Sequence, residues 1–458
     1  MADVAAAPAD GGAARAPRTS LGIIFLVLFI DLVGFSMVFP LFGQMLTFYQ
    51  SHDEGLLHAG LTWVGGLLPQ ASTMQRAALF GGVLAALYSG LQFVFAPVWG
   101  RLSDRYGRRP ILLLSIVGTT TAYGLWIISS SFSLLLVSRV IAGTMTGNIA
   151  VANAAAADIS SPAKRSSAMA VLGIAFGLGF VIGPAIGGGS WAFSAHHLPS
   201  LSDPTNHWLN PFSLTAGIAF ALSLINLLWA MARFQETLPP ERRQVHAAQT
   251  RTINPAQILD PSLGQGVARI NLSFLLYTVL FACLESTLVF LTAEKRAFTP
   301  ATNACLFVWM GVVSALVQGG IFRRMAGRYG VRPFVLIGFV VMLPGFLCIG
   351  LIDWFPSTAL LAVGATILAC GSGLVFPGLN TMVSLAGDAQ RQGWVMGTFR
   401  SAGALGRAVG PLLGALLYFT IRPAAPYVFG AIGMLIPLYL IAHLRGKGAE
   451  RPAGDATA

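Results

Sequence analysis

Residues 105–110 read Arg-Tyr-Gly-Arg-Arg-Pro and residues 328–333 read Arg-Tyr-Gly-Val-Arg-Pro, so five of six positions match at an offset of 223 residues. A second match lies at nearly the same offset. Residues 183–187 read Gly-Pro-Ala-Ile-Gly, and residues 410–414 read Gly-Pro-Leu-Leu-Gly, an offset of 227. Two independent matches at nearly one spacing indicate that the chain is a duplicated unit.

The composition around these motifs excludes an ordinary water-soluble protein. Of 458 residues, 55% are apolar and only 10% are charged, and 52 glycines come in addition. Soluble domains carry about 25% charged residues, and disorder requires low hydrophobicity, so we expect a chain that folds in lipid. The cysteines have no metal-ligand spacing and are expected to be small buried apolar side chains; they are Cys283, Cys305, Cys348 and Cys370.

Apolar runs long enough to cross a bilayer, about 20 residues each, occur twelve times. We therefore expect an all-α, polytopic membrane protein with twelve transmembrane helices in two six-helix pseudo-repeats. The expected helices lie near residues 21–42, 79–99, 111–131, 133–157, 167–189, 212–232, 269–293, 303–322, 334–352, 358–384, 394–419 and 423–443. The expected division is an N-terminal tail (1–20), a first half (21–232), a cytoplasmic linker (233–268), a second half (269–443) and a C-terminal tail (444–458).

The distribution of basic residues predicts the orientation. With the N-terminus inside, the inner segments hold 21 of the 28 Lys and Arg residues, and the outer segments hold four. Cytoplasmic loops of membrane proteins carry such an excess, so both termini are expected in the cytoplasm and the chain in the inner (plasma) membrane. The net charge of +11 then needs no nucleic-acid partner. The long outer segments 43–78 and 190–211 are expected to be solvated connectors without a metal site.

The loop after the second expected helix reads, over residues 100–110, Gly-Arg-Leu-Ser-Asp-Arg-Tyr-Gly-Arg-Arg-Pro. It is a tight turn in which one acid stands among four bases, and Gly107 permits a backbone geometry that other residues resist. From composition alone, a merely solvated basic loop is an equal alternative.

In these residues the chain resembles the major facilitator superfamily, and within it the drug:proton antiporters, especially the bacterial tetracycline efflux pumps. The resemblance extends over nearly all of residues 21–443. It implies a conformational latch formed by Gly100, Asp104, Arg105, Gly107, Arg108 and Asp158. Asp104 is expected near the start of the eleventh helix, at Gly393–Thr398, and Arg108 near Asp158. Gly327 stands where the second copy would carry the acid, so the latch is expected to be asymmetric.

A glycine-rich stretch marks the fifth expected helix. Small residues let a second helix approach closely, and a proline can bend the helix. The alternative is ordinary helix packing. The stretch resembles the antiporter signature, which implies export; its residues are Gly173, Gly177, Gly183, Pro184, Gly187 and Gly188.

Charged residues inside the expected helices are functional candidates, because burying them in a membrane is expensive. At 1.5 Å per residue, Asp31 lies about 15 Å and Arg139 about 20 Å from the inner face, which permits a pair. The resemblance implies that Arg139 assists proton transfer, and Asp31 is the leading proton carrier. The alternatives are a snorkelling Arg139 and a fixed ion pair. Glu285 and Arg407 are a second candidate pair, on neighbouring helices of the family fold.

Uncharged polar residues are the candidates for substrate contact, although each alone is more often a helix-packing group; they are Gln92, Asn148, Gln318 and Asn380. The tetracycline pumps carry an acid in helix three just before a tyrosine, where this chain has Ala122. We therefore expect tetracycline to be a poor substrate or none, unless Ala122 merely faces lipid or packing.

The sequence contains neither a phosphate-cradling P-loop nor a catalytic constellation, so the chain is not expected to be an enzyme or to need a cofactor. The expected function is proton-coupled export of small, largely apolar or amphiphilic molecules such as drugs, by a monomer driven by the proton gradient. A proton-coupled importer is the alternative, and a transport-dead sensor on the same fold is a third hypothesis.

Overall fold

The structure, a computed structural model, describes residues 19–52, 55–59, 73–161, 164–202, 208–239, 258–298, 300–388 and 391–444. Within these ranges the regular structure is helical throughout. Residues 240–257, the middle of the expected linker, lie outside the described residues, as do residues 1–18 and 445–458 of the terminal tails.

The first half contains six main helical stretches with short helices between them. Its elements are α1 (Leu21–Ser36), η1 (Phe39–Leu41), α2 (Phe42–His52), α4 (Thr73–Tyr106), α5 (Arg108–Ile127), α6 (Phe132–Thr144), α7 (Gly147–Asp158), α8 (Arg165–His197), η3 (Pro199–Ser202) and α9 (Ser213–Arg233).

The second half repeats this pattern. Its elements are η5 (Pro261–Leu263), α11 (Val267–Arg296), α12 (Pro300–Leu316), the π-helical η6 (Val317–Phe322), α13 (Arg323–Tyr329), α14 (Arg332–Gly350), η7 (Leu351–Asp353), α15 (Thr358–Ala386), α16 (Gln392–Thr420), α17 (Ala425–Gly433) and α18 (Leu435–Ala442).

Among the described residues, ten helical stretches are long and apolar enough to cross a membrane. The other two expected helices correspond to α1, a shorter apolar helix of 16 residues, and to α4, of 34 residues. The predicted all-α fold with twelve transmembrane helices in two repeats is thus confirmed.

Several predicted boundaries were wrong. The first helix ends at Ser36 rather than residue 42, and α2 then runs to His52 through the expected outer connector. Pro40 cannot donate a backbone hydrogen bond, which fits a break there. The fourth helix is interrupted between α6 and α7, where the Trp99 indole donates to the Thr144 carbonyl at 2.6 Å. The fifth helix continues to His197.

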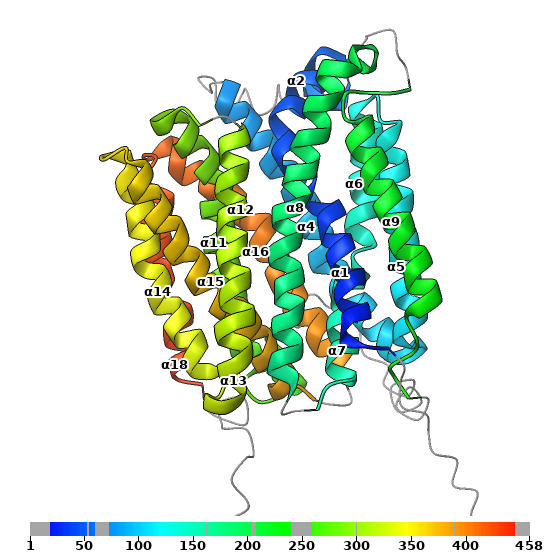
Figure 1. The fold of residues 1–458 in the computed structure, drawn as a ribbon, viewed down its shortest axis with the longest axis vertical. Helices are drawn as coiled ribbons and strands as arrows, with labels where there is room; N and C mark the ends of the chain where they lie inside the picture. The colour runs from blue at the N-terminus through cyan, green and yellow to red at the C-terminus, as the bar shows by residue number, and fades with distance from the viewer. Residues whose placement is uncertain are drawn as a thin grey trace, which may run out of the picture.

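The halves lie side by side, with α5, α6 and α9 on one flank of the bundle and α14, α15 and α18 on the other (Figure 1). Between the flanks, α4 packs against α16, and α8 packs against α12 and α15. Both ends of the described chain lie at one end of the bundle, at the bottom of Figure 1. We call this the terminal end; the loops at Gly107 and Gly330 lie there as well.

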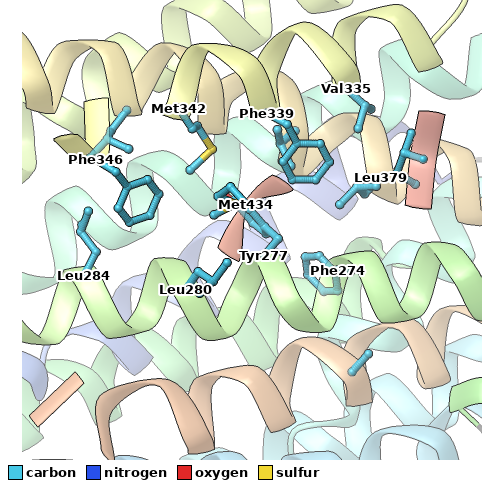
Figure 2. Close-up of a cluster of buried hydrophobic side chains, with 14 of the residues drawn as sticks. Phe274, Tyr277, Leu280, Leu284, Val335, Phe339, Met342, Phe346, Leu379 and Met434 are labelled. Carbon is cyan, nitrogen blue, oxygen red and sulfur yellow. The ribbon is translucent and has the colours of Figure 1, made fainter. Parts of the chain in front are cut away.

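Aromatic and aliphatic side chains hold the second half together. In Figure 2, Phe274 and Tyr277 from α11 lie beside Phe339 and Met342 from α14. The rings of Phe274 and Phe399 stack, with centroids 4.0 Å apart. Since lipid already surrounds apolar surface, such close packing rather than hydrophobic burial stabilises helix contacts in a membrane.

Candidate functional site

The glycines of α8 bring this helix into backbone contact with α1. A Cβ atom added at Gly183 would overlap the Ser36 hydroxyl, and one at Gly187 would overlap the Met37 carbonyl oxygen. The Ser36 hydroxyl also donates to the Gly179 carbonyl at 2.8 Å. The predicted close approach of a second helix therefore takes place on this face of α8.

A different face of α8 contacts the second half. A Cβ atom at Gly173 would overlap Oε1 of Gln318, and one at Gly177 would lie 3.7 Å from the Gly311 carbonyl oxygen. Gln318, a predicted substrate-contact residue, thus packs in the interface between the halves, at the start of η6. At Gly188 an added Cβ would meet nothing within 4 Å, so this motif glycine makes room for no neighbour. Pro184 lies inside α8.

Asp31 is buried in α1, with 8% of its surface exposed. Its polar neighbour is the side chain of Asn148 on α7, which sequence reasoning had proposed for substrate contact. Tyr88 and Tyr123 lie within electrostatic range of the carboxyl group. Among the described residues, Asp31 forms no ion pair.

Arg139, on α6, is buried but does not pair with Asp31. Its Nη2 donates to the Ser138 hydroxyl at 3.1 Å, and its guanidinium carbon lies 4.7 Å from the Trp126 ring centroid. The predicted direct pair with Asp31 is therefore absent from this conformation. An aromatic face can hold an arginine through a cation–π contact.

The second candidate pair is also not an ion pair. Arg407 on α16 donates from Nη2 to Oε1 of Gln92 on α4 at 2.8 Å, which joins the two halves. Glu285 on α11 is half-buried and lies within electrostatic range of Arg407, but the two groups are not in direct contact. Glu285 and Arg407 thus lie near each other, as predicted, but Arg407 hydrogen-bonds to Gln92 rather than to Glu285.

A polar cluster between the halves was missed by sequence reasoning. Oδ1 of Asn153 on α7 accepts from Nδ2 of Asn380 at 3.0 Å and from Nη2 of Arg400 at 2.9 Å. Asn380 was a predicted cavity residue, but Asn153 and Arg400 were not assigned a role. The signal lay in the repeat, because residues 153 and 380 are separated by the same 227 residues as the Gly-Pro motifs.

Arg400 is surrounded by aromatic rings rather than carboxylates. It is 2% exposed, and its guanidinium carbon lies 4.7 Å from the ring centroid of Phe176 and 5.4 Å from that of Phe376. Its Nε has no hydrogen-bond partner among the described residues. Arg407 is close enough for the two positive charges to repel each other.

At the terminal end, the predicted contacts of the loop are present. Asp104 pairs with Arg108 at 2.6 Å and accepts from the backbone N–H of Trp394 on α16 at 2.8 Å. Arg108 also pairs with Asp158 at 2.9 Å. Trp394 lies inside the predicted stretch of the eleventh helix, so these contacts link the halves as expected.

The remaining loop residues have separate roles. Gly107 has φ of 104°, a geometry that favours glycine, and the Gly100 carbonyl accepts from the Ser103 hydroxyl. Arg105 is exposed and stacks on the neighbouring Tyr106, and it forms no ion pair with the residues that the structure describes. In the second repeat, a Cβ atom at Gly327 would meet nothing within 4 Å; the asymmetry of the latch stays a prediction.

The segment after α9 binds the same loop. The Glu236 carboxylate accepts from the backbone N–H groups of Arg108 and Arg109 at 2.9 and 3.2 Å, at the start of α5. It also accepts from Thr237 and Leu238 at 3.0 Å each. A carboxylate at a helix N-terminus satisfies free N–H groups and the helix dipole. The start of the linker is therefore anchored on the loop.

Ala122 is fully buried, and its carbonyl accepts from the Ser138 hydroxyl at 3.0 Å. It thus packs against α6, which favours the packing alternative for this position. The expectation about tetracycline remains a prediction.

The chain is similar to known proteins over almost its whole length. The profile of the Major Facilitator Superfamily matches residues 24–411 and 321–457. Major facilitator superfamily domain-containing protein 10 of Bos taurus is 34% identical over 455 residues, 94% of each chain. The class B tetracycline resistance protein of Escherichia coli is 27% identical, covering 88% of this chain and 89% of its own. The crystal structure of the human organic anion transporter MFSD10 (TETRAN) matches with a TM-score of 0.79 and 30% identity, over 93% of this chain and 99% of that one.

Proposed function

The chain belongs to the Major Facilitator Superfamily, and from this premise we propose that it is a proton-coupled antiporter that exports small amphiphilic molecules, organic anions among them. Its relatives and its fold support a transporter in a membrane, and the proposal assigns it no enzymatic activity. In this proposal it works as a monomer in the plasma membrane, with both termini in the cytoplasm. The proton gradient supplies the energy, and no cofactor takes part.

The observation that carries the proposal is a pair of carboxyl groups, one in the first helix of each half. Asp31 on α1 and Glu285 on α11 form no ion pair among the described residues, although Arg407 lies on α16, which packs against α11, and Arg139 lies with Asp31 within electrostatic range of Tyr88. A buried carboxyl without a cation partner costs least when it is neutral. Each group is therefore suited to take up a proton in one conformation and to release it when an arginine approaches.

Direction is supported by two features. The glycines of α8 contact α1 on one face and the second half on another, as expected for the stretch that resembles the antiporter signature. The tetracycline resistance proteins, whose names state a resistance function, are similar over most of the chain. Both features favour export over import.

The substrate class is supported by the charges between the halves. Arg400 and Arg407 lie close to each other there, with Glu285 within electrostatic range of Arg407, so the arginines outnumber the carboxyl and its protonation would increase the positive excess. A similar solved protein is described as an organic anion transporter. An amphiphile with a negative group suits such surroundings, because aromatic side chains can contact its apolar body.

Transport by alternating access would follow from movement of the halves about the site between them. In this structure α4 and α16 are joined at the terminal end by the contact of Asp104 with Trp394. If the terminal end is cytoplasmic, this conformation is closed to the cytoplasm. Its opening requires that the contacts of Asp104 and Arg400 across the interface break.

Purified protein in lipid vesicles with an imposed pH gradient tests the proposal. We expect a radiolabelled aromatic carboxylate, naphthoate, to move against the direction of proton flow, and the movement to stop when an ionophore collapses the gradient. Movement with the protons would support the importer. The absence of gradient-driven flux for naphthoate and for lipophilic drugs would support the sensor, and would overturn the proposal.

A further inference from the structure

We propose that Arg400 is the residue that binds the negative group of the substrate, and that Asn153 takes the place of that group while the terminal end is closed. This inference rests on the proposed function, since it requires a transported organic anion. It assigns a site of carboxylate or sulfonate recognition to the polar cluster between the halves. The site would be filled by the protein in one conformation and by substrate in the other.

The position of Arg400 is the first argument. It lies eight residues after the start of α16 at Gln392, about 12 Å into the bundle from the terminal end at 1.5 Å per residue. Its ligand atom, Oδ1 of Asn153, belongs to α7 of the other half. Any movement that separates the halves at the terminal end therefore removes this ligand and exposes the guanidinium to that side.

The chemistry of the cluster is the second argument. A buried arginine is ordinarily paired with a carboxylate, yet the hydrogen-bond partner of Arg400 is a neutral amide oxygen. Its Nε and Oδ1 of Asn380 are buried without partners among the described residues. A guanidinium presents parallel N–H groups that match a carboxylate, so an incoming anion would satisfy donors that Asn153 leaves unused.

The aromatic rings are the third argument. Phe176 on α8 and Phe376 on α15 both face the guanidinium, and their own centroids are 5.0 Å apart. They come from different halves, so they too would separate as the terminal end opens. An amphiphile with an aromatic body could then bind beside Arg400 with its negative group on the guanidinium.

Comparison of the two repeats shows that only the second half has an arginine at the position of Arg400. Asn153 and Asn380 occupy equivalent positions at the offset of 227 residues, and they hydrogen-bond to each other across the interface. The equivalent of Arg400 at this offset is Gly173, which contacts Gln318. The amide pair is thus symmetric, whereas the positive charge belongs to the second half alone. A single anionic group is the ligand that this asymmetry fits.

In a transport cycle, Arg400 would bind Oδ1 of Asn153 and the negative group of the substrate in turn. With the terminal end open, Arg400 is free to capture an anion from the cytoplasm. As the halves close, Oδ1 of Asn153 competes with the anion for the Nη2 donor, one of the groups that the anion would occupy, and so weakens the binding of the anion before its release on the far side. If Arg400 only held the two halves together, as a lock, it would make the same contacts in this structure. The experiment must therefore separate a lock from a substrate-binding residue.

The test compares binding of naphthoate with binding of its neutral isostere naphthamide, in detergent, for four variants that purify as folded monodisperse protein. We expect Arg400→Gln to weaken naphthoate binding at least about tenfold while naphthamide binding changes less than about twofold; tenfold corresponds to about 1.4 kcal/mol. Arg400→Lys keeps the charge but loses the forked geometry, and should show an intermediate loss. Asn153→Ala should strengthen naphthoate binding, because the competing oxygen is removed.

Arg165→Gln is the matched control. Arg165 also crosses the interface near the terminal end, where its Nη1 donates to the Ser384 carbonyl at 3.2 Å. Its loss should shift naphthoate and naphthamide binding by the same factor. If Arg400→Gln and Asn153→Ala also shift both probes equally, Arg400 is a lock and the inference is wrong. If Arg400→Gln does not fold, the opposite effects expected of Arg400→Lys and Asn153→Ala on naphthoate decide the matter.

Failure of the proposed function has a different signature. If wild-type vesicles show no gradient-driven flux of naphthoate, the transport proposal fails whatever Arg400 does. If wild-type protein transports naphthoate and Arg400→Gln transports it equally well, the transport proposal stands and this inference is overturned.

Discussion

At the scale of single residues, Gly187 and Gly188 are neighbours in α8 with opposite surroundings. A Cβ atom at Gly187 would overlap the backbone of Met37, the residue that follows α1, whereas one at Gly188 would meet nothing within 4 Å. We expect Gly187→Ala to lower stability by about 1–3 kcal/mol, the usual cost of overpacking, and Gly188→Ala to leave it unchanged. Thermal unfolding of the two purified variants in one detergent measures this; equal midpoints would contradict the described approach of α1 and α8.

The residue scale also shows what sequence could and could not predict about the site. The helical rise gives the depth of a residue, so Asp31 and Arg139 were correctly expected inside the bundle. Depth does not fix the direction in which a side chain points, and Arg139 turns to Ser138 and Trp126 instead. The bond between Asn153 and Arg400 joins residues 247 positions apart, which local pattern cannot pair. The contacts of Asp104 could be predicted because a whole motif carries them.

At the scale of elements, the latch joins α4 to α16 through Asp104. Asp104→Ala removes the ion pair with Arg108 and the bond to the Trp394 N–H, so we expect the terminal end to open more often. The measurement is thiol labelling of Ser401→Cys in a background without the four native cysteines, because Ser401 bonds the Phe93 carbonyl in the same interface. Labelling should accelerate roughly tenfold, as for a shift of about 1.4 kcal/mol.

Asp260→Ala is the control for this measurement, because Asp260 caps only Ser262 in a surface turn of the second half. Its labelling rate should equal that of the parent. An unchanged rate in Asp104→Ala would show that Asp104 does not hold the halves together.

The N-terminus of α5 is held by the Glu236 carboxylate. Glu236→Ala leaves the N–H groups of Arg108 and Arg109 without their acceptor, and we expect a loss of about 1–3 kcal/mol, the range for bonds to charged groups. Glu236→Gln keeps one oxygen and should lose about half as much. Thermal unfolding should give midpoints that fall in the order wild type, Glu236→Gln, Glu236→Ala. A Glu236→Ala variant as stable as wild type would show that the linker does not anchor the loop.

Element boundaries were the least predictable part of the fold. Hydrophobic length located all twelve helices, because each must cross about 30 Å of lipid. The break between α6 and α7 and the π-helical turn at η6 depend on tertiary partners, such as Trp99 at the Thr144 carbonyl. Most of α2 follows the apolar run that predicted the first helix, and its residues are not apolar enough to predict another membrane helix. The sequence therefore predicted a connector there.

At the scale of the whole molecule, the two halves meet along α4 with α16 and along α8 with α12 and α15. The groups that would separate on opening are Asp104 with Trp394 between α4 and α16, Asn153 with Arg400 between α7 and α16, and Gly173 with Gln318 between α8 and η6. The candidate proton carriers lie in α1 and α11, the first helix of each half. Movement of the halves and uptake of protons can therefore be linked through Arg407, which lies near Glu285 and hydrogen-bonds Gln92 of the other half.

The central claim is that substrate and protons exchange through Asp31, and substrate-induced proton movement in reconstituted vesicles tests it most directly. Asp31→Asn keeps size and polarity but cannot carry a proton. We expect it to fold, to bind naphthoate, and to lose naphthoate-evoked proton movement by at least about tenfold, or about 1.4 kcal/mol; Asp260→Asn, outside the membrane helices, should match wild type. Undiminished proton movement in Asp31→Asn would contradict the account and transfer the role to Glu285.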